Sequence, residues 1–175
     1  VSNSEVDMVV IATSGDAALV STLSAIESGK SIALANKEAV VMAGELVISQ
    51  VRKHGVSLLP LDSEPNAIWQ CIHGESANPQ RVIITASGGP FRGVPNDSLH
   101  NVTPEQALKH PTWNMGPRIT IDSSTLMNKG FEVIEAKWLF NVDWSQIEVV
   151  VHPQSIIHSM VEFDDGSIKA QMAMP

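Results

Sequence analysis

The sequence has one cysteine, few basic residues and no long apolar segment. Cys71 has no partner for an internal disulfide, which suits a reducing compartment. The longest apolar run, 39–48, is interrupted by Gly44 and Glu45 and falls short of the roughly 18 residues that a membrane span needs. Eleven lysines and arginines stand against 19 aspartates and glutamates, and the net charge of −8 argues against nucleic acid and anionic membranes as partners.

The N-terminal third of the chain alternates between apolar runs and stretches with helical spacing. We predict strands over 6–12, 31–35 and 56–61, separated by helices over 17–28 and 39–53. This alternation predicts parallel strands with crossover helices, and ligands bind such sheets beyond the carboxyl ends of the strands.

A glycine-rich G-x-G-x-x-G fingerprint is missing from this part, so the sheet alone does not indicate a dinucleotide. If it belongs to a Rossmann-like domain, we expect the glycine-bearing half to lie outside the chain. At 175 residues and 43% hydrophobic content, the chain can form one domain or two small ones. The fold class we predict is α/β: the C-terminal half of a Rossmann-like parallel sheet over 1–61, followed by an α+β domain over 62–175.

Two carboxylates, Asp62 and Glu64, follow the apolar run that ends at Leu61. Pro65 disfavours helical dihedral angles at Glu64, so we expect an extended segment in which both carboxylates point to one side. Like charges this close favour a cation between them, and a hard divalent ion is the natural candidate. The alternative is that Ser63 or Glu64 caps a helix whose first residue is Pro65.

The rest of the chain is more irregular. The predicted elements are a helix over 66–73, a strand over 81–86, a proline-rich loop over 93–118, a strand over 118–122, a helix ending near Phe140 with Phe131, Ile134 and Trp138 facing the core, and strands over 147–151, 156–163 and 167–172. His158 lies in one of these strands, and a structural role is the more common one for such a histidine.

Two loops carry residues suited to binding. In Ser87-Gly88-Gly89-Pro90, consecutive glycines allow backbone N–H groups to converge on an anion, although a tight structural turn explains the pattern equally well. The loop from His110 to Pro117 contains Trp113 and Met115, and long loops of this kind are often lids or binding loops. The alternative for Trp113 is a core anchor.

The segment after residue 122 combines hydroxyls, a lysine and acidic residues. Ser123-Ser124-Thr125 near the expected helix start, with Lys129, suits a phosphate, whereas ordinary N-capping by the serines needs no ligand. Asn128 and Glu132 share a helix face. Glu132 and Glu135 are both available as a third carboxylate, and spacing alone does not choose between them.

These blocks occur together in one order. They are Ala35-Asn36-Lys37-Glu38, Leu61-Asp62-Ser63-Glu64-x-Asn66-Ala67-Ile68, Ser87-Gly88-Gly89-Pro90-Phe91, His110-Pro111-x-Trp113-x-Met115-Gly116, Asp122-Ser123-x-Thr125-Leu126-Met127-Asn128-Lys129-Gly130-x-Glu132 and His152-Pro153-Gln154-Ser155-x-Ile157-His158-Ser159-Met160-Val161. Over nearly its whole length the chain resembles the 1-deoxy-D-xylulose 5-phosphate reductoisomerase family.

The resemblance implies an NADP-dependent oxidoreductase of non-mevalonate isoprenoid biosynthesis. Such an enzyme isomerises 1-deoxy-D-xylulose 5-phosphate and reduces it to 2-C-methyl-D-erythritol 4-phosphate, with NADPH and a divalent metal (Mg²⁺, Mn²⁺ or Co²⁺) as cofactors. The alternative is a metal-binding or sugar-phosphate-binding module without catalysis.

The resemblance also implies residue roles. The metal ligands would be Asp62, Glu64 and Glu132, which selects Glu132 over Glu135, and with Lys37 they form the catalytic set. The substrate would contact Lys37, Ser63, Glu64, Ser87, His110, Ser123, Asn128, Lys129 and Glu132. NADPH would contact Asn36, Glu38 and Gly116, and Trp113 with Met115 would form a flap over the substrate.

The family context adds three expectations. The family forms homodimers, which makes the strands between 147 and 172 a candidate interface. The location would be the cytoplasm in a bacterium, or the plastid stroma in a plant or apicomplexan. The family's N-terminal glycine-rich loop and C-terminal helical domain are not in the sequence, so we expect little or no turnover from this chain by itself.

Overall fold

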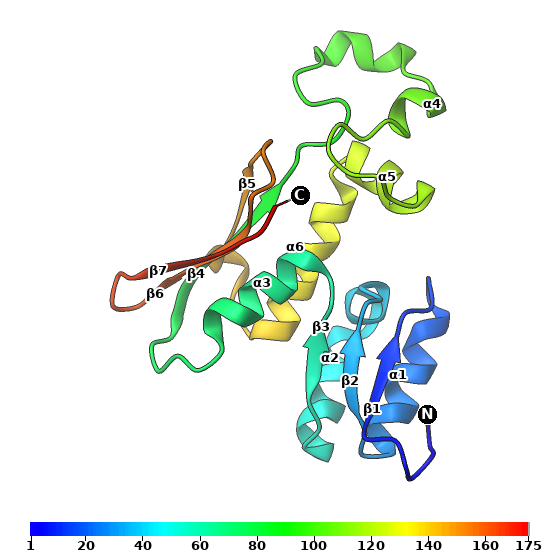
Figure 1. Cartoon of the computed structure of the whole chain (residues 1–175), viewed down its shortest axis with the longest axis vertical. Coiled ribbons are helices and arrows are strands. Elements are labelled where there is room, and N and C mark those ends of the chain that lie inside the picture. Colours follow the sequence, from blue (N-terminus) through cyan, green and yellow to red (C-terminus); the bar gives the residue numbers. More distant parts are fainter. Residues whose placement is uncertain (175) are drawn as a thin grey trace.

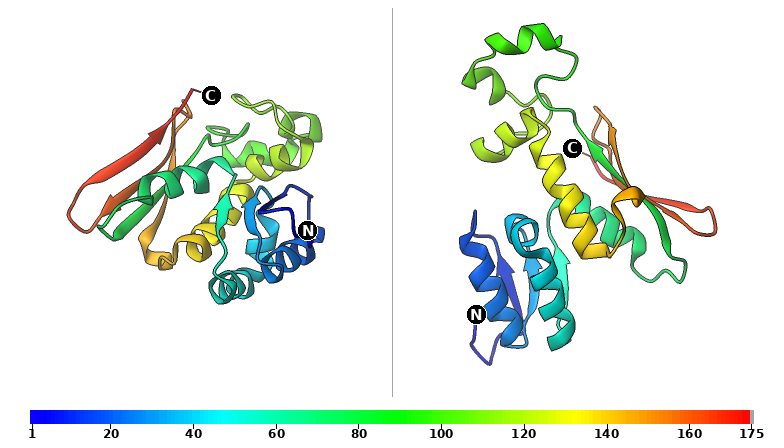
Figure 2. Two further views of the ribbon diagram at one scale, coloured as in Figure 1. Left: turned by 60° about the horizontal axis from the view of Figure 1, so that its bottom comes forward. Right: turned by 180° about the vertical axis from the view of Figure 1, so that it is seen from behind.

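Two β-sheets lie on either side of one long helix (Figure 1). Figure 1 shows the computed structural model, which describes residues 1–174. Helix α6 (Met127–Phe140) crosses between the sheets, as the rear view in Figure 2 also shows. The segment that carries α4 and α5 lies at the top of Figure 1, above the start of α6. The fold is therefore mixed α/β, as predicted.

The N-terminal sheet has three parallel strands in the order β1 (Met8–Ile11), β2 (Ser31–Leu34) and β3 (Leu58–Pro60). Helices α1 (Ala17–Glu27) and α2 (Glu38–His54) form the crossovers and pack against each other. Their buried aliphatic side chains and those of the strands form one hydrophobic core. The predicted strand–helix alternation is confirmed.

Helix α2 is bent where it meets α6. Ala43 has non-helical dihedral angles (φ −143°, ψ 35°), and a Cβ on the next residue, Gly44, would lie 2.2 Å from Cδ1 of Trp138. The indole of Trp138 therefore packs directly on the backbone of α2 and joins α6 to the N-terminal core. The predicted core stripe of α6 is only half-buried, whereas Glu132, Glu135 and Ala136 are buried.

The second sheet has four strands around a central β4 (Pro79–Ala86). This strand pairs in parallel with β5 (Ile147–Val151) and antiparallel with β6 (Ile157–Phe163), and β6 forms a hairpin with the edge strand β7 (Ile168–Met172). Side chains of α3 (Ser63–Ile72) and α6 close a second hydrophobic core with β4 and β6. These strands lie where the sequence predicts them.

One predicted strand, 118–122, is wrong. The structure has helix α5 (Pro117–Ser124) there, with Gly116 as its N-cap residue. Proline at the first helical position already has the φ of a helix, and this local signal outweighs the alternating β-branched residues. Ser123 and Ser124 consequently end α5 and do not begin α6, so the N-capping alternative for them is wrong as well.

Three short helical segments complete the chain: η1 (Asn96–Asn101), α4 (Pro104–Ala107) and η2 (Trp144–Gln146). Thr103 caps α4 in a capping box with Gln106, and Pro104 occupies the first turn of this helix. Among the residues that the structure describes, no helix has the length and apolar character needed to cross a membrane.

Candidate active site

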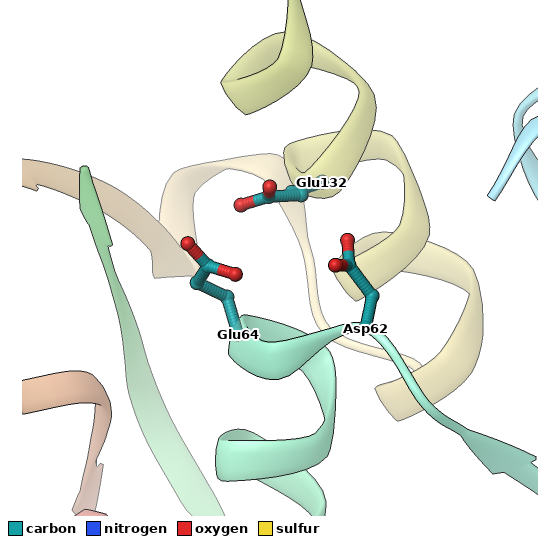
Figure 3. Close-up of side chains that lie close together, drawn as sticks. All are labelled: Asp62, Glu64 and Glu132. Atoms are coloured by element: carbon teal, nitrogen blue, oxygen red, sulfur yellow. The ribbon is translucent and has the colours of Figure 1, made fainter. Parts of the chain in front are cut away.

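Three acidic side chains from two helices meet between the two sheets. Asp62, Glu64 and Glu132 each contribute one carboxylate oxygen to a group in which all three atoms lie within 4.8 Å of one another (Figure 3). Glu132 is fully buried, and the other two are half-buried. Residues 70 positions apart in the sequence thus form one oxygen-rich group.

The segment around Asp62 differs from the expected extended geometry. Asp62 alone is extended (φ −62°, ψ 140°), and its Oδ1 accepts a hydrogen bond from the Ser63 N–H at 3.1 Å. Helix α3 begins at Ser63, so Glu64 is helical and Pro65 occupies the first turn, where a missing N–H costs no hydrogen bond. The residue that caps the helix is Asp62, which therefore serves both the helix and the acidic group.

Lys37 reaches the acidic group from the N-cap position of α2. Its Nζ lies 2.5 Å from Oδ2 of Asp62, 2.6 Å from Oδ1 of Asn128 and 3.5 Å from Oε1 of Glu132. Burial alone would lower the pKa of Lys37, but the negative charges of Asp62 and Glu132 outweigh it and raise the pKa. Lys37 is therefore a fixed positive charge.

A second lysine, Lys129, lies on the other side of Glu132. Its Nζ donates to Oε1 of Glu64 at 2.8 Å and also to Glu132. Burial would lower the pKa of Lys129, but the carboxylates of Glu132 and Glu64 raise it. The acidic group keeps one more carboxylate than ammonium.

The two carboxylates that face Lys129 shift in opposite directions. Burial raises the pKa of Glu64, but the charge and hydrogen bond of Lys129 outweigh it and lower the pKa below its ordinary value. For Glu132, complete burial, together with the negative charge of Glu64, raises the pKa to about 7. Glu132 is thus the member of the group that exchanges a proton near neutral pH.

Glu135 lies one turn further along α6 and outside the group of three carboxylates. It is buried, and its Oε2 has no hydrogen-bond partner. Burial and the negative charge of Asp62 raise its pKa well above the ordinary range. Of the two glutamates that spacing left open, Glu132 joins Asp62 and Glu64.

A cavity of about 430 Å³ opens beside the acidic group. All residues predicted to contact the substrate line it except Lys37, and so do Trp113 and Met115. Trp113 is half-buried and belongs to neither hydrophobic core, so the core-anchor alternative is wrong. The structure thus gathers the predicted substrate and flap residues around one space.

Ser87 and His110 form a fixed pair on this cavity. The Oγ of Ser87 lies 2.9 Å from Nε2 of His110, and Nδ1 of His110 accepts backbone N–H groups of Thr112 and Trp113. Because Nδ1 is an acceptor, the hydrogen of the neutral ring is on Nε2 and points to Ser87. Burial, with the nearby charge of Arg92, lowers the pKa of His110 and favours that neutral form.

The glycine turn after Ser87 packs against the end of α5. Gly89 has φ +68°, and a Cβ on it would lie 2.5 Å from the carbonyl oxygen of Ser123. Such close approach is available only to glycine. The turn is therefore a tight structural one, and it places Ser87 and Ser123 on the same cavity.

A second cavity of about 300 Å³ lies between the ends of β1 and β2 and the start of α5. The residues predicted to contact NADPH, namely Asn36, Glu38 and Gly116, line it together with Lys37. The side-chain amide of Asn36 hydrogen-bonds to the backbone at both ends: its Nδ2 donates to the carbonyls of Thr13 and Gly15, and its Oδ1 accepts from the N–H of Ala39. Asn36 therefore shapes this cavity mainly by holding its loop.

Three residues with polar side chains on the large cavity were not predicted as binding residues: Thr85, Ser155 and His158. The ring of His158 lies 6.4 Å from that of Trp113 between centroids, on the wall of this cavity. Strand periodicity offers no signal for such residues, because they line the cavity only once β6 lies beside β4.

Comparisons with known proteins agree with this architecture. Residues 58–140 match the family described as 1-deoxy-D-xylulose 5-phosphate reductoisomerase C-terminal domain, and residues 1–44 match the family described as 1-deoxy-D-xylulose 5-phosphate reductoisomerase. The chain is 60% identical to the 1-deoxy-D-xylulose 5-phosphate reductoisomerase of Heliobacterium modesticaldum, with 98% of this chain and 44% of that protein covered. It is 61% identical to the protein of the same name from Clostridium botulinum, with 98% of this chain and 45% of that protein covered.

Solved structures agree as well. The chain superposes with a TM-score of 0.92 and 48% identity on DOX-P reductoisomerase in complex with NADPH, fosmidomycin and magnesium, covering 99% of this chain and 45% of that one. It also superposes, with a TM-score of 0.87 and 53% identity, on 1-deoxy-D-xylulose 5-phosphate reductoisomerase from Zymomonas mobilis in complex with NADPH. This superposition covers 97% of this chain and 44% of that one. The chain spans less than half the length of these proteins. It belongs to the 1-deoxy-D-xylulose 5-phosphate reductoisomerase family.

Proposed function

We propose that this chain forms the metal-binding and substrate-binding part of an enzyme that converts 1-deoxy-D-xylulose 5-phosphate to 2-C-methyl-D-erythritol 4-phosphate. The observation that carries the proposal is the meeting of Asp62, Glu64 and Glu132 on a cavity that also holds Ser87 and Ser123. Carboxylates suit a divalent cation, and hydroxyls suit the phosphate of the substrate. The names of the relatives and the superposed structures agree with it.

The acidic group fits a hard divalent cation such as Mg²⁺, Mn²⁺ or Co²⁺. Its donors are all carboxylate oxygens, they come from separate elements, and they outnumber the ammonium groups beside them. A divalent cation held by Asp62, Glu64 and Glu132 supplies Lewis-acid stabilisation of negative charge on sugar oxygens.

The protein's own side chains position the substrate around this centre. Lys37 supplies a fixed positive charge, and Asn128 holds it by accepting its hydrogen bond while donating to Glu132 at 2.5 Å. At the phosphate, we propose contacts from Ser63, Ser87, His110, Ser123, Asn128 and Lys129. Binding energy gained at the phosphate holds the reacting carbons in place, and Trp113 with Met115 covers them against water.

For the reduction we propose NADPH in the second cavity, beside Asn36, Glu38 and Gly116. This cavity and the larger one share Asn128 and Ile119 as lining residues, so a nicotinamide in one lies next to a substrate in the other. The superposed structures that contain NADPH support the choice of cofactor.

The organisation of the whole protein is part of the same proposal. We propose that residues 1–61 belong to an NADPH-binding domain and residues 62–175 to the catalytic domain. We also propose a homodimer through the strands between 147 and 172, where several aliphatic side chains of β5 and β7 are exposed. We further propose a cytoplasmic location, which the bacterial origin of the relatives cited above supports.

The proposal is tested by measuring NADPH oxidation with 1-deoxy-D-xylulose 5-phosphate and Mg²⁺. The assay uses this chain and the same sequence extended to the length of its relatives. We expect metal-dependent turnover in the extended protein and little in the 175-residue chain. Binding of substrate and metal without turnover in the extended protein would favour a binding module and refute the enzyme.

A further inference from the structure

An ion pair joins the start of α5 to the start of α2. Nη2 of Arg118 lies 3.1 Å from Oε1 of Glu38, and both side chains line the second cavity. The guanidinium also lies over the turn that follows β1, because a Cβ on Gly15 would be 3.6 Å from Nη1 of Arg118. Within residues 1–174, this is the only ion pair made by the segment between β4 and α6. Arg118 therefore connects that segment to the N-terminal sheet.

The arginine is unfavourably placed for the helix that carries it. Arg118 is the second residue of α5, whose first turn contains no acidic side chain. A positive charge there opposes the helix dipole, whereas Glu38, in the first turn of α2, is favourably placed. A neutral or acidic residue at position 118 would suit α5 better. The contact with Glu38 gives the arginine a role outside its own helix.

The loop directly before α5 carries Trp113 and Met115 to the large cavity. One end of this loop is held by His110, whose Nδ1 accepts the N–H of Trp113 at 2.9 Å. The other end is Gly116, whose carbonyl accepts the hydroxyl hydrogen of Thr120 at 2.8 Å. That bond fixes Gly116 to α5 itself, so the position of this end of the loop depends on how α5 is held.

We propose that Arg118 is a positioning residue: through its ion pair with Glu38 it holds the start of α5, and it thereby keeps Trp113 and Met115 in place over the large cavity. The wall of the second cavity thus helps to place the loop that covers the first. The side chain of Arg118 is 61% exposed, and an exposed ion pair contributes little to the stability of a whole chain, so its effect is local. The inference rests on the proposed function only for the identity of the molecules that occupy the two cavities.

The test is hydrogen–deuterium exchange of the 175-residue chain, without substrate or cofactor. It is measured at the N–H groups of Thr112, Trp113 and Thr120, which are hydrogen-bonded within the loop and α5. We expect exchange that is about twofold to fivefold faster in Arg118→Gln, the range that loss of an exposed ion pair gives in a local equilibrium. Removal of a cation from the helix N-terminus would by itself slow exchange, so the direction of the change separates the two effects.

Further variants provide the controls. Glu38→Gln should match Arg118→Gln, and the double variant should add nothing, because both changes remove the same interaction. Arg118→Lys keeps the positive charge and should exchange at close to the parent rate. Lys137→Gln breaks an ion pair with Asp143 elsewhere in the chain, at 3.2 Å, and should leave exchange of the loop unchanged.

Thermal unfolding of the same variants separates a local effect from a global one. We expect Arg118→Gln and the parent to melt at similar temperatures. A lowered melting temperature with faster exchange throughout the chain would make Arg118 a purely structural residue and overturn the inference. Unchanged or slower exchange of the loop in Arg118→Gln, or additive effects of the two single changes, would also overturn it. These outcomes leave the proposed function intact, because neither substrate nor cofactor takes part in the measurement.

Discussion

Nζ of Lys37 lies 2.5 Å from Oδ2 of Asp62, although the two residues follow different strands. Lys37 comes after β2 and Asp62 after β3, and these strands are parallel neighbours whose carboxyl ends meet at one edge of the sheet. Helix α6 adds Asn128 and Glu132 from the other part of the chain. The candidate site therefore depends on how α6 sits against the N-terminal sheet.

The packing of Trp138 on Gly44 tests that dependence. In Gly44→Ala the new Cβ would lie 2.2 Å from the indole, so the helices must move apart. We expect a loss of about 2–3 kcal/mol in the free energy of unfolding, as for other overpacked cores, measured by denaturant titration. The matched control is Gly130→Ala on α6, where nothing lies within 4 Å of a Cβ. That change should stabilise the chain by about 0.5–1 kcal/mol, and equal effects of both changes would contradict the account.

The contact between Gly89 and Ser123 is tested in the same way. Gly89→Ala combines a positive φ with a Cβ 2.5 Å from a backbone oxygen, whereas Gly93→Ala has a positive φ and open space. We expect a cost of about 1–2 kcal/mol for Gly93→Ala and a clearly larger cost for Gly89→Ala. Phosphate affinity should fall only in Gly89→Ala. If both variants keep the parent's phosphate affinity, the turn does not organise the phosphate end of the cavity.

The raised pKa of Glu132 predicts that the stability of the metal-free chain decreases as the pH rises. Its pKa in the folded chain is about 7, above its ordinary value of 4.5, so the folded state holds the proton more tightly. The stability from this proton is complete below pH 4.5 and is lost as the pH rises through about 7, by at most about 1.4 kcal/mol per pH unit.

Glu132→Gln mimics the protonated form at every pH and should remove that dependence. In the absence of metal, we expect the variant to unfold at a higher temperature than the parent at pH 8 and at a similar temperature at pH 5. Melting curves across this range provide the check. A parent whose stability rises between pH 6 and pH 8, with the variant following it, would show that Glu132 is already ionised at pH 6.

Glu135 gives a matched comparison within the same helix. It is buried like Glu132 but lies outside the acidic group, and burial raises its pKa. Glu135→Gln should leave Mn²⁺ affinity within about twofold of the parent, because a residue outside the ligand set contributes little. If Glu135→Gln weakened Mn²⁺ binding more than Glu132→Gln, the choice of Glu132 over Glu135 as the metal ligand would be wrong.

The sequence predicted the positions of most strands better than the local geometry around the candidate site. Apolar runs located both sheets, because buried strands need continuous or alternating apolar residues. The extended geometry predicted for Glu64 was wrong, because Asp62 caps a helix that begins at Ser63 and places Pro65 in its first turn. The strand predicted over 118–122 was wrong for the related reason that Pro117 begins a helix there.

Other parts of the site could not be predicted, because they depend on tertiary contacts. Periodicity assigned Phe131 and Ile134 to the core of α6, whereas the helix buries Glu132 because two lysines from different segments balance it. The choice of Glu132 over Glu135 came from the family resemblance and not from spacing. Ser155 was missed because neither its burial nor its backbone leaves a mark in a single sequence.

The most direct test of the account is a calorimetric titration of Mn²⁺ into the chain and into Asp62→Asn. Asparagine caps a helix as well as aspartate does, so this change removes a metal ligand and keeps the start of α3. Glu27→Gln, at the exposed end of α1, is the control. We predict one Mn²⁺ site in the parent and in Glu27→Gln, and at least tenfold weaker binding in Asp62→Asn. Equal Mn²⁺ affinity in all three proteins, or none in the parent, would contradict the claim that these carboxylates hold a cation.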